Sequence, residues 1–466
     1  MKQAMRPVAI ALLALIGLSA VWLTGIQANA GSDYRDDPRN VRVARAPADT
    51  ARGNIVTADG VVVAEDDPDG GRRYPEGSRY AHIVGYDASA GRTGVELTRY
   101  AAMQTRDDGS ITSWILGLLG ADLGPPDVHL TIVDEVQQAA EAALGSKTGA
   151  VVAIDPRTGA VLAYSSSPAF DPNDVVDGFF DPDDDGSVDE VIDRAADRLL
   201  PPGSTFKVIV TAAALEAGLT PDTTFDDATE YVPPGGVAIH NAGGGDCITG
   251  STLMLTDALV VSCNVVFSRL AVDLGASAVV GAAEDAWFNH RFAWETSAAK
   301  SSLPSAADLA ADIPALAQSG IGERDVRATP LLMAMIAAAL GNDGVAMAPY
   351  VVSDIVAPDG EAIETTEPAV LGRMFPSAVV DDLLAMMEAV VDQGTGRPGG
   401  VSGVRVAGKT GTAEGAGGPH AWFIAVAPVE DPTIAVAVLV EGGGAGGSVA
   451  APIAARVIAA WLAFDS

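Results

Sequence analysis

The sequence predicts an α+β protein, with an antiparallel sheet flanked by helices, a small N-terminal domain and an N-terminal apolar helix. Strand-like runs open the main domain after Pro125-Pro126, and three more follow one another between 403 and 441. Alanine-rich segments with helical patterning fill the region between them. A sheet completed by strands from both ends of a domain, with helices between, indicates the α+β class.

The length and the charge of the chain limit the number of domains and the kinds of partner that it can have. The chain has 466 residues, more than one typical domain, so we expect two folded units. Acidic residues outnumber basic ones 61 to 28, which excludes nucleic acid as a partner because phosphates need clustered Lys and Arg. The surplus indicates a solvated acidic surface. Lysine is rare, so a lysine within a motif is informative.

The N-terminus predicts a single-pass membrane anchor. The run 8–26 is apolar and uncharged, and Lys2 and Arg6 precede it. At ~1.5 Å per residue it spans roughly 28 Å, close to the ~30 Å hydrocarbon core of a bilayer. The positive residues predict a cytoplasmic tail (1–7) and an extracytoplasmic body in the cell membrane. A signal peptide cleaved after Ala28-Asn29-Ala30 is the alternative, and it also exports the body.

The remaining chain divides into a linker, a small domain and a large one. Residues 27–51 form a polar linker, and 52–125 carry short strand-like runs and one helical run, a pedestal too small to be a second enzyme. The main domain, 126–466, starts with a strand that leads into an amphipathic helix. It continues with a hairpin around 155–159, helical segments at 203–217, 251–274 and 329–341, three antiparallel strands, and a last helix over 449–464.

Two cysteines, Cys247 and Cys263, lie sixteen positions apart. In an oxidising compartment a disulfide between them is plausible, and two buried thiols are the alternative. The sequence leaves both open.

Ser204 and Lys207 are the candidate nucleophile and base. The run PPGSTFK (201–207) opens an apolar helix, and the helix is expected to start at or near Ser204. Residues three apart share a helix face, so the lysine amine should lie near the hydroxyl. A neutral amine can take the serine proton, and the helix N-terminus favours the developing anion. Burial and a second cation must lower the lysine pKa from ~10.4.

Two further motifs complete the candidate site. Lys409 is the candidate second cation, in a strand that continues through Thr410, Gly411 and Thr412 and whose glycine lets a substrate backbone lie alongside. The run Ser262-Cys263-Asn264 separates two helical stretches; its serine can pass a proton to a leaving group, and its asparagine can hold the base and a substrate amide.

Decoys show that each motif alone is weak. The stretch 297–300 is another Ser-x-x-Lys, but no apolar helix follows to bury its lysine. The stretch 147–149 is another Lys-Thr-Gly, but it precedes every other element. Only the set 204–207, 262–264 and 409–411 combines the order, the helix and the strand.

The ordered triplet resembles that of the penicillin-recognising serine transferases. RGNIVTADG, GRTGVELTRY, LTIVDEVQQAA, PPGSTFK, SCN, GKTGTAE and PHAWFIAVAP are similar to class B penicillin-binding proteins, and the brevity and the run AAPIAARVIAA resemble the penicillin-binding protein A subgroup. The resemblance covers nearly the whole chain beyond the anchor. It differs at Asp193, where the family usually has Asn, and at Glu323, where Gln is common.

The resemblance implies a transpeptidase fold and a peptidoglycan D,D-transpeptidase. Ser204 would be acylated by a stem peptide ending in D-Ala-D-Ala, or by a β-lactam, with Lys207 as base. Ser262 and Asn264 would relay protons and position substrate. Lys409 and Thr410 would bind the substrate carboxylate, and backbone N–H groups of Thr412 and Ser204 would form an oxyanion hole. No cofactor is implied, and glycan strands would come from a membrane glycosyltransferase partner.

Two alternatives share the acylation chemistry. A serine β-lactamase needs a placed base for deacylation, and the sequence contains no Glu-x-x-Leu-Asn stretch. A non-catalytic β-lactam sensor would need cytoplasmic signalling machinery, whereas only about seven residues precede the apolar run. No histidine spacing indicates a triad or a metal, and His420 is interpreted as structural.

One acidic loop follows the order of a calcium loop. Carboxylates stand at positions 1, 3, 5 and 9 of the stretch 181–189, with glycine at position 6. Position 12 is Ile192 where a glutamate is wanted, so an acidic surface loop is the favoured interpretation and no metal site is predicted.

Overall fold

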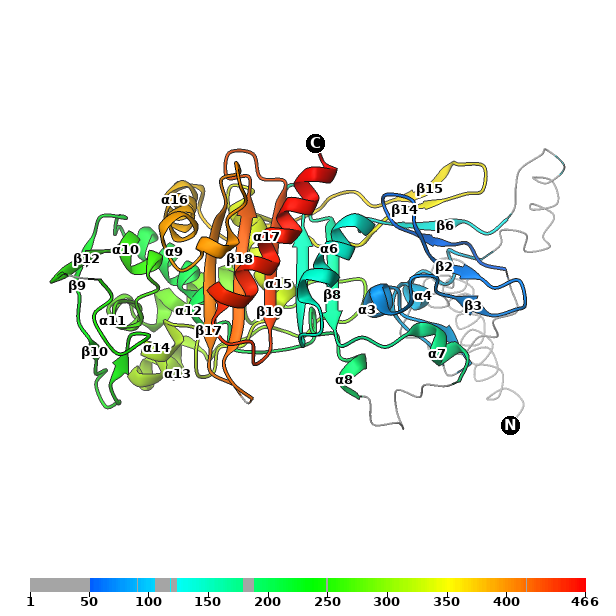
Figure 1. Ribbon diagram of the computed structural model, residues 1–466. Coiled ribbons are helices and arrows are strands. Elements are labelled where there is room, and N and C mark those ends of the chain that lie inside the picture. Colours follow the sequence, from blue (N-terminus) through cyan, green and yellow to red (C-terminus); the bar gives the residue numbers. More distant parts are fainter. Residues whose placement is uncertain are drawn as a thin grey trace, which may run out of the picture.

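The computed structural model describes residues 51–89, 91–104, 118, 124–178, 188–248, 250–415 and 417–466 (Figure 1). The predicted anchor and linker, and positions 181–187 of the acidic loop, lie outside the described residues. The anchor and the calcium hypothesis therefore stay predictions.

A five-stranded antiparallel sheet forms the centre of the main domain. Its order is β17 (Ala407–Ala413), β18 (His420–Ala427), β19 (Ile434–Val440), β7 (Gly149–Ile154) and β8 (Val161–Ser167). β19 pairs with β7, so strands from the two ends of the domain complete one sheet, as the sequence predicts. All residues of β18 and β19 are buried, because helices cover both sheet faces.

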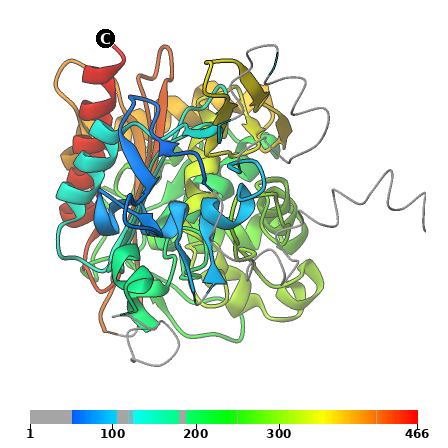
Figure 2. The same cartoon turned by 90° about the vertical axis from the view of Figure 1, so that its right-hand side faces the viewer.

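Helices cover the two faces of this sheet. α17 (Gly446–Phe464) and α6 (Asp134–Leu144) lie side by side on one face, and α15 (Pro330–Leu340) packs on the other (Figures 1 and 2). Among the described helices α17 is long and apolar enough to cross a membrane. Its buried side is part of the core against the sheet, and Trp461 Nε1 donates to Thr433 Oγ1 at 2.9 Å.

A helical lobe lies beside the face that α15 covers (Figure 1). It contains η2 (Gly203–Phe206), α9 (Lys207–Glu216), α10 (Leu255–Val260), α11 (Asn264–Leu274), α12 (Ala276–Asp285), α13 (Ala306–Ala311), α14 (Ile313–Ser319), α16 (Ser377–Gln393) and η3 (Arg397–Gly399). Short strands edge it: β9 (Thr224–Asp226) pairs with β12 (Thr252–Met254), β10 (Glu230–Tyr231) with β11 (Ile239–His240), and β13 (Val345–Met347) with β16 (Val370–Arg373).

A second sheet, of six strands, forms the opposite end of the molecule. Its order is β15 (Ala362–Thr365), β14 (Val352–Val356), β6 (Asp127–Leu130), β1 (Ile55–Val56), β2 (Val62–Asp66) and β3 (Arg72–Arg73). β1 runs parallel to β6, and β6 pairs antiparallel with β14. Strands from both sides of the predicted 125/126 boundary therefore share one sheet.

Short elements complete this end. They are η1 (Gly77–Tyr80), α3 (Ala81–Val84), β4 (Asp87–Ala88), β5 (Gly91–Arg92), α4 (Gly94–Thr98), α7 (Pro172–Val176) and α8 (Val188–Val191). Their buried side chains include Tyr80, Ile83 and Val95, which join the main hydrophobic core.

Candidate active site

Ser204 lies on a tight turn that is pressed against the edge of the central sheet. The turn is the 3-10 segment η2, and the α-helix α9 starts only at Lys207, three residues later than the earliest start expected. Gly203 has φ +53°, and a Cβ there would lie 2.7 Å from the carbonyl oxygen of Thr412. Only glycine permits this approach, which brings Ser204 next to β17.

Lys207 is fully buried, and its amine is hydrogen-bonded to the Ser262-Cys263-Asn264 turn. Its Nζ donates to the backbone oxygen of Ser262 at 2.7 Å and to Asn264 Oδ1 at 2.8 Å, and lies 3.3 Å from Ser262 Oγ. The two short bonds account for both N–H groups of a neutral amine and leave its lone pair free. Across the described residues no hydrogen bond joins Lys207 to Ser204, so the direct contact expected from their spacing is not formed.

Lys409 also contacts Ser262. It too is fully buried, and its Nζ donates to Ser262 Oγ at 2.9 Å and to the carbonyl oxygen of Thr410 at 3.0 Å. One serine hydroxyl therefore lies between two lysine amines. Ser262 adopts φ +62°, a conformation that a non-glycine residue takes only when its surroundings enforce it.

Burial sets the protonation of both lysines. Desolvation holds the pKa of Lys207 well below its usual range, and the positive charge of Lys409 lowers it further, against a smaller opposing effect of Glu323. Desolvation lowers the pKa of Lys409 to about 7. A lysine without a proton at neutral pH can act as a base, as the sequence argument requires.

A disulfide anchors the Ser262-Cys263-Asn264 turn. Cys247 and Cys263 are joined with a Cα–Cα distance of 5.6 Å, which decides between the two alternatives left open by the sequence. Asn241 supports the same turn: its Oδ1 accepts from the Val265 N–H at 3.0 Å. A carboxylate oxygen of Asp227 and the two sulfurs lie within 4.8 Å of one another, but disulfide sulfurs are not thiolates, so this group is a poor metal site.

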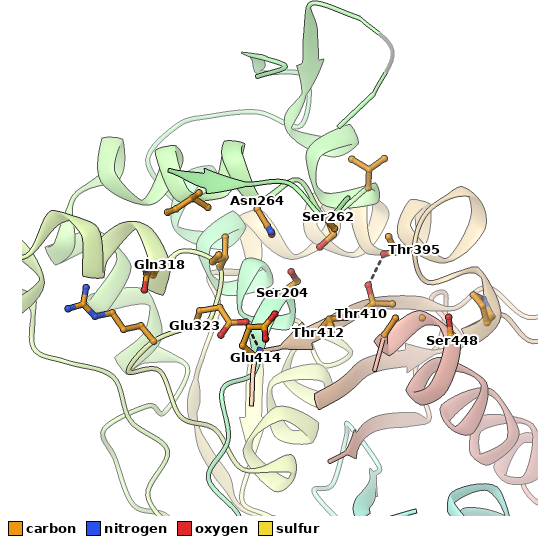
Figure 3. A pocket seen from close by; sticks show the side chains of 18 residues that line it. Ser204, Ser262, Asn264, Gln318, Glu323, Thr395, Thr410, Thr412, Glu414 and Ser448 are labelled. Carbon is orange, nitrogen blue, oxygen red and sulfur yellow. Dashed lines mark hydrogen bonds between the residues drawn. The ribbon is translucent and has the colours of Figure 1, made fainter. Parts of the chain in front are cut away.

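These residues surround a cavity of about 830 Å³ (Figure 3). Ser204, Ser262 and Asn264 face one another across it, while the two lysines are buried behind its wall. β17 forms another wall and is an edge strand of the central sheet, so its outward backbone groups can pair with an extended ligand.

Hydroxyl groups gather at the β17 end of the cavity. Thr410 Oγ1 lies 2.7 Å from Thr395 Oγ1, and Thr412 Oγ1 accepts from the Gly446 N–H at 3.2 Å. Gly446 starts α17, and Ser448 in its first turn also lines the cavity. Hydroxyls near buried Lys409 suit a carboxylate ligand.

Other residues singled out by the sequence lie elsewhere. Gly411 does not line the cavity: a Cβ there would lie 2.6 Å from the carbonyl oxygen of Pro202, so this glycine lets the serine turn reach the strand. Of the decoys, Ser297 Oγ donates to Asp197 Oδ2, and Lys147 Nζ donates to the carbonyl oxygen of Leu144. His420 is buried, and its Nδ1 accepts from the Gly442 N–H at 3.1 Å.

The two departures from the family pattern have different surroundings. Asp193 packs away from the cavity: its Oδ2 accepts from Tyr164 Oη at 2.6 Å, and its Oδ1 accepts from the Ala195 and Ala196 N–H groups. Burial raises the pKa of Asp193 to about 7. Glu323 instead lines the cavity.

Sequence reasoning missed several cavity residues. Thr395, Glu414 and Ser448 were not expected there, and of these only Glu414 belongs to a run that carries the family resemblance, GKTGTAE. Glu323 was noted only as an unusual residue. Two signals could have found Glu414: it ends the run GKTGTAE, and it directly follows the strand that carries Lys409.

Comparisons with known proteins agree with this geometry. The penicillin-binding protein transpeptidase domain matches residues 149–459, and the penicillin-binding protein A dimerisation domain matches residues 52–122. The peptidoglycan D,D-transpeptidase PbpA of Mycolicibacterium smegmatis is 37% identical over 495 residues, and the PbpA of Mycobacterium tuberculosis is 35% identical over 498; each alignment covers 99% of both chains.

Solved structures of penicillin-binding proteins have the same fold as this chain. The ceftriaxone acyl-enzyme complex of penicillin-binding protein A from M. tuberculosis superposes with a TM-score of 0.81 at 34% identity, covering 88% of this chain and 98% of that one. A D,D-transpeptidase domain from Eggerthella lenta also gives 0.81, at 32% identity, covering 90% and 99%. The chain therefore belongs to the penicillin-binding protein transpeptidase family, as its motifs predict.

Proposed function

We propose that this protein is a peptidoglycan D,D-transpeptidase that works through an acyl-enzyme on Ser204, and that β-lactams acylate the same residue. One observation carries the proposal: Ser262 Oγ lies between two buried lysine amines, at 3.3 Å from Lys207 and 2.9 Å from Lys409, beside the cavity that contains Ser204. Burial makes one of these amines a base, and the pair can pass a proton across Ser262.

Acylation uses these groups in order. Ser204 Oγ gives its proton to the lone pair of Lys207 and bonds to the carbonyl carbon of the penultimate D-Ala. Catalytic hydrogen bonds often tighten only with substrate in place, so the absent Ser204–Lys207 bond is compatible with this step. The amide C–N bond then breaks, and Ser262 relays the proton from Lys207 to the departing D-Ala nitrogen. An ester on Ser204 and free D-Ala result.

The substrate is held at both sides of the reacting carbon. Backbone N–H groups of Ser204 and Thr412 would stabilise the oxyanion, since Gly203 brings the turn against β17. Lys409 and Thr410 would bind the terminal carboxylate, and Asn264 would hold both Lys207 and the substrate amide. Gly411 contributes by leaving room for the serine turn.

Transfer completes the reaction. An amine of a neighbouring stem peptide bonds to the acyl carbon, the C–Oγ bond breaks, and Ser204 recovers a proton through Lys207. The product is a cross-link between two stems. The relatives named D,D-transpeptidase and the β-lactam acyl-enzyme structures support this assignment.

The same proposal includes the organisation expected from the sequence. Residues 1–7 form a cytoplasmic tail, 8–26 a membrane anchor, 27–51 a linker, 52–125 the pedestal and 126–466 the transpeptidase domain. The charge-free apolar run, preceded by Lys2 and Arg6, supports an extracytoplasmic active site. Because the pedestal is too small to polymerise glycan, a membrane glycosyltransferase would supply the strands.

Intact-mass spectrometry after exposure to a β-lactam tests the assignment. Wild type should gain one β-lactam mass that maps to Ser204, and Ser204→Ala should gain none. Ser297→Ala is the matched control, and it should acylate like wild type. Acylation of Ser204→Ala, or an adduct on Ser297, would overturn the site. Hydrolysis of the adduct within seconds would indicate the β-lactamase alternative instead.

A further inference from the structure

The catalytic cavity has two chemically opposite ends, with Ser204 between them (Figure 3). Hydroxyls of Thr395, Thr410 and Ser448 line one end, which suits the carboxylate of the donor. The other end carries the carboxyl groups of Glu323 and Glu414. Negatively charged carboxyl groups would repel the donor carboxylate, so this end of the cavity must act on another part of the reaction.

Glu323 is held rigidly against the nucleophile turn. The Gly203 N–H donates to the Gly322 carbonyl oxygen at 3.0 Å, and a Cβ on Gly322 would lie 2.1 Å from the Gly203 oxygen. Gly322 and Arg324 both have positive φ, +73° and +59°, so the backbone on each side of Glu323 is in the left-handed region. Such conformations persist where the surroundings fix them, commonly at functional sites.

One carboxylate oxygen of Glu323 is used and the other is free. Oε1 accepts from the Glu414 N–H at 3.2 Å, which ties the residue to the end of β17. Within the described residues Oε2 accepts no hydrogen bond. The Glu414 side chain is exposed at the same end, so two carboxyl groups face one part of the cavity.

Few positive charges offset this pair. Arg324 lines the cavity, but its guanidinium is paired with Asp312 at 2.8 Å and lies 3.5 Å from Asp325. The hydrogen bond from the Glu414 N–H lowers the pKa of the Glu323 carboxyl, and the charges of Arg327 and Lys207 lower it by less. Burial has the larger effect and, together with the Glu414 charge, raises that pKa to about 7. The carboxyl can therefore exchange a proton near neutral pH.

Resting on the transpeptidase function proposed above, we infer that Glu323, assisted by Glu414, binds the ammonium group of the acceptor and takes its proton. The acceptor arrives as R–NH₃⁺, and a proton passes to Glu323, leaving a neutral amine and a carboxylic acid. The amine nitrogen bonds to the acyl carbon and the C–Oγ bond breaks. The second amine proton reaches Ser204 Oγ through Lys207, and Glu323 releases its proton to solvent.

The test measures how the acyl-enzyme partitions between an amine and water. The full chain is given an N-acyl-D-alanyl thioester as donor and D-alaninamide as acceptor, because this amide carries an amine and no carboxylate. Aminolysis and hydrolysis products are quantified at rising acceptor concentration from pH 6 to 9. The ratio of the two products does not depend on how fast the acyl-enzyme forms. Variants are Glu323→Gln, Glu323→Asp and Glu414→Gln, with Glu361→Gln on an exposed turn as control.

Loss of one charge-assisted hydrogen bond should raise the half-saturating acceptor concentration about tenfold in Glu323→Gln. The exposed Glu414→Gln should shift it less, about threefold. Glu323→Asp, which keeps the charge, should recover part of the loss, and Glu361→Gln should match wild type. In wild type aminolysis should rise as Glu323 ionises through about pH 7, and Glu323→Gln should lack this rise.

Three results would overturn the inference. The half-saturating concentration could be unchanged in Glu323→Gln; the pH profiles of the two proteins could coincide; or the variant could slow hydrolysis alone, which would make Glu323 a base for water. Wild type that forms the acyl-enzyme but never transfers it to an amine would instead refute the proposed transpeptidase function.

Discussion

Asp193 offers a quantitative test of how burial changes the ionisation of a carboxyl group and the stability of the fold. Its carboxyl is enclosed by Tyr164 Oη and two backbone N–H groups, and burial raises its pKa to about 7 from the usual 3.8. The variant Asp193→Asn places the usual family residue here. We predict that its free energy of unfolding, relative to that of wild type, is higher at pH 8 than at pH 4.

The sign follows from proton linkage. A carboxyl whose folded pKa is raised binds more protons when folded, so its contribution is fully present below about pH 4 and is lost as the pH rises through about 7. A shift of about three units at 1.36 kcal/mol each gives an upper value of about 4 kcal/mol. We expect about 2–4 kcal/mol, because local relaxation reduces the cost of the buried charge.

The measurement is urea unfolding of the purified full-length chain at pH 4, 6 and 8. The free energy of unfolding of Asp193→Asn minus that of wild type should increase across this window. An imperfect amide contact with Tyr164 would shift all three values equally, so the slope is diagnostic. Asp381→Asn, an exposed position on α16, is the matched control. A difference that is flat with pH would refute the reasoning.

Two further predictions concern the catalytic motifs. Lys207→Arg introduces a side chain that stays charged at working pH and so cannot act as a base. The rate of β-lactam acylation, measured by stopped flow, should fall by ~10²–10⁴. A rate within about threefold of wild type would remove the lysine from the mechanism. Breaking the disulfide with Cys247→Ser and Cys263→Ser should lower the free energy of unfolding by about 3 kcal/mol, as expected for a loop of about this length. It should also slow acylation, because Cys263 lies between Ser262 and Asn264, the two catalytic residues of its turn. Unchanged melting and acylation in the reduced and serine forms would contradict this.

The central sheet was predictable because its pattern is simple. Continuous apolar runs bounded by turn residues indicate buried strands, and the runs that became β7, β18 and β19 are of this kind. The α+β argument predicted that strands from the two ends of the domain share one sheet, and the pairing of β19 with β7 is how they do so. The three motifs likewise supplied part of the cavity lining, namely Ser204, Ser262, Asn264, Thr410 and Thr412.

Long-range contacts were not predictable. The sequence placed Lys207 beside Ser204 because they are three residues apart, yet Ser262 and Asn264, more than fifty residues away, take its hydrogen bonds. The 3-10 turn changes the direction of the side chains, and spacing alone does not report this. The Thr395–Thr410 contact and the position of Glu414 depend on the packing of separate elements in the same way.

The sheet at the far end has a consequence for how the protein can be divided. β6 lies on the transpeptidase side of the predicted 125/126 boundary, yet one of its neighbours is β1, and Val128 and Leu130 are fully buried. A recombinant fragment that starts at 126 would present this apolar strand with an unpaired edge, a template for aggregation. A soluble, crystallisable fragment should therefore keep residues from 51 onward, and exchange of domains between relatives should be made elsewhere than at this border.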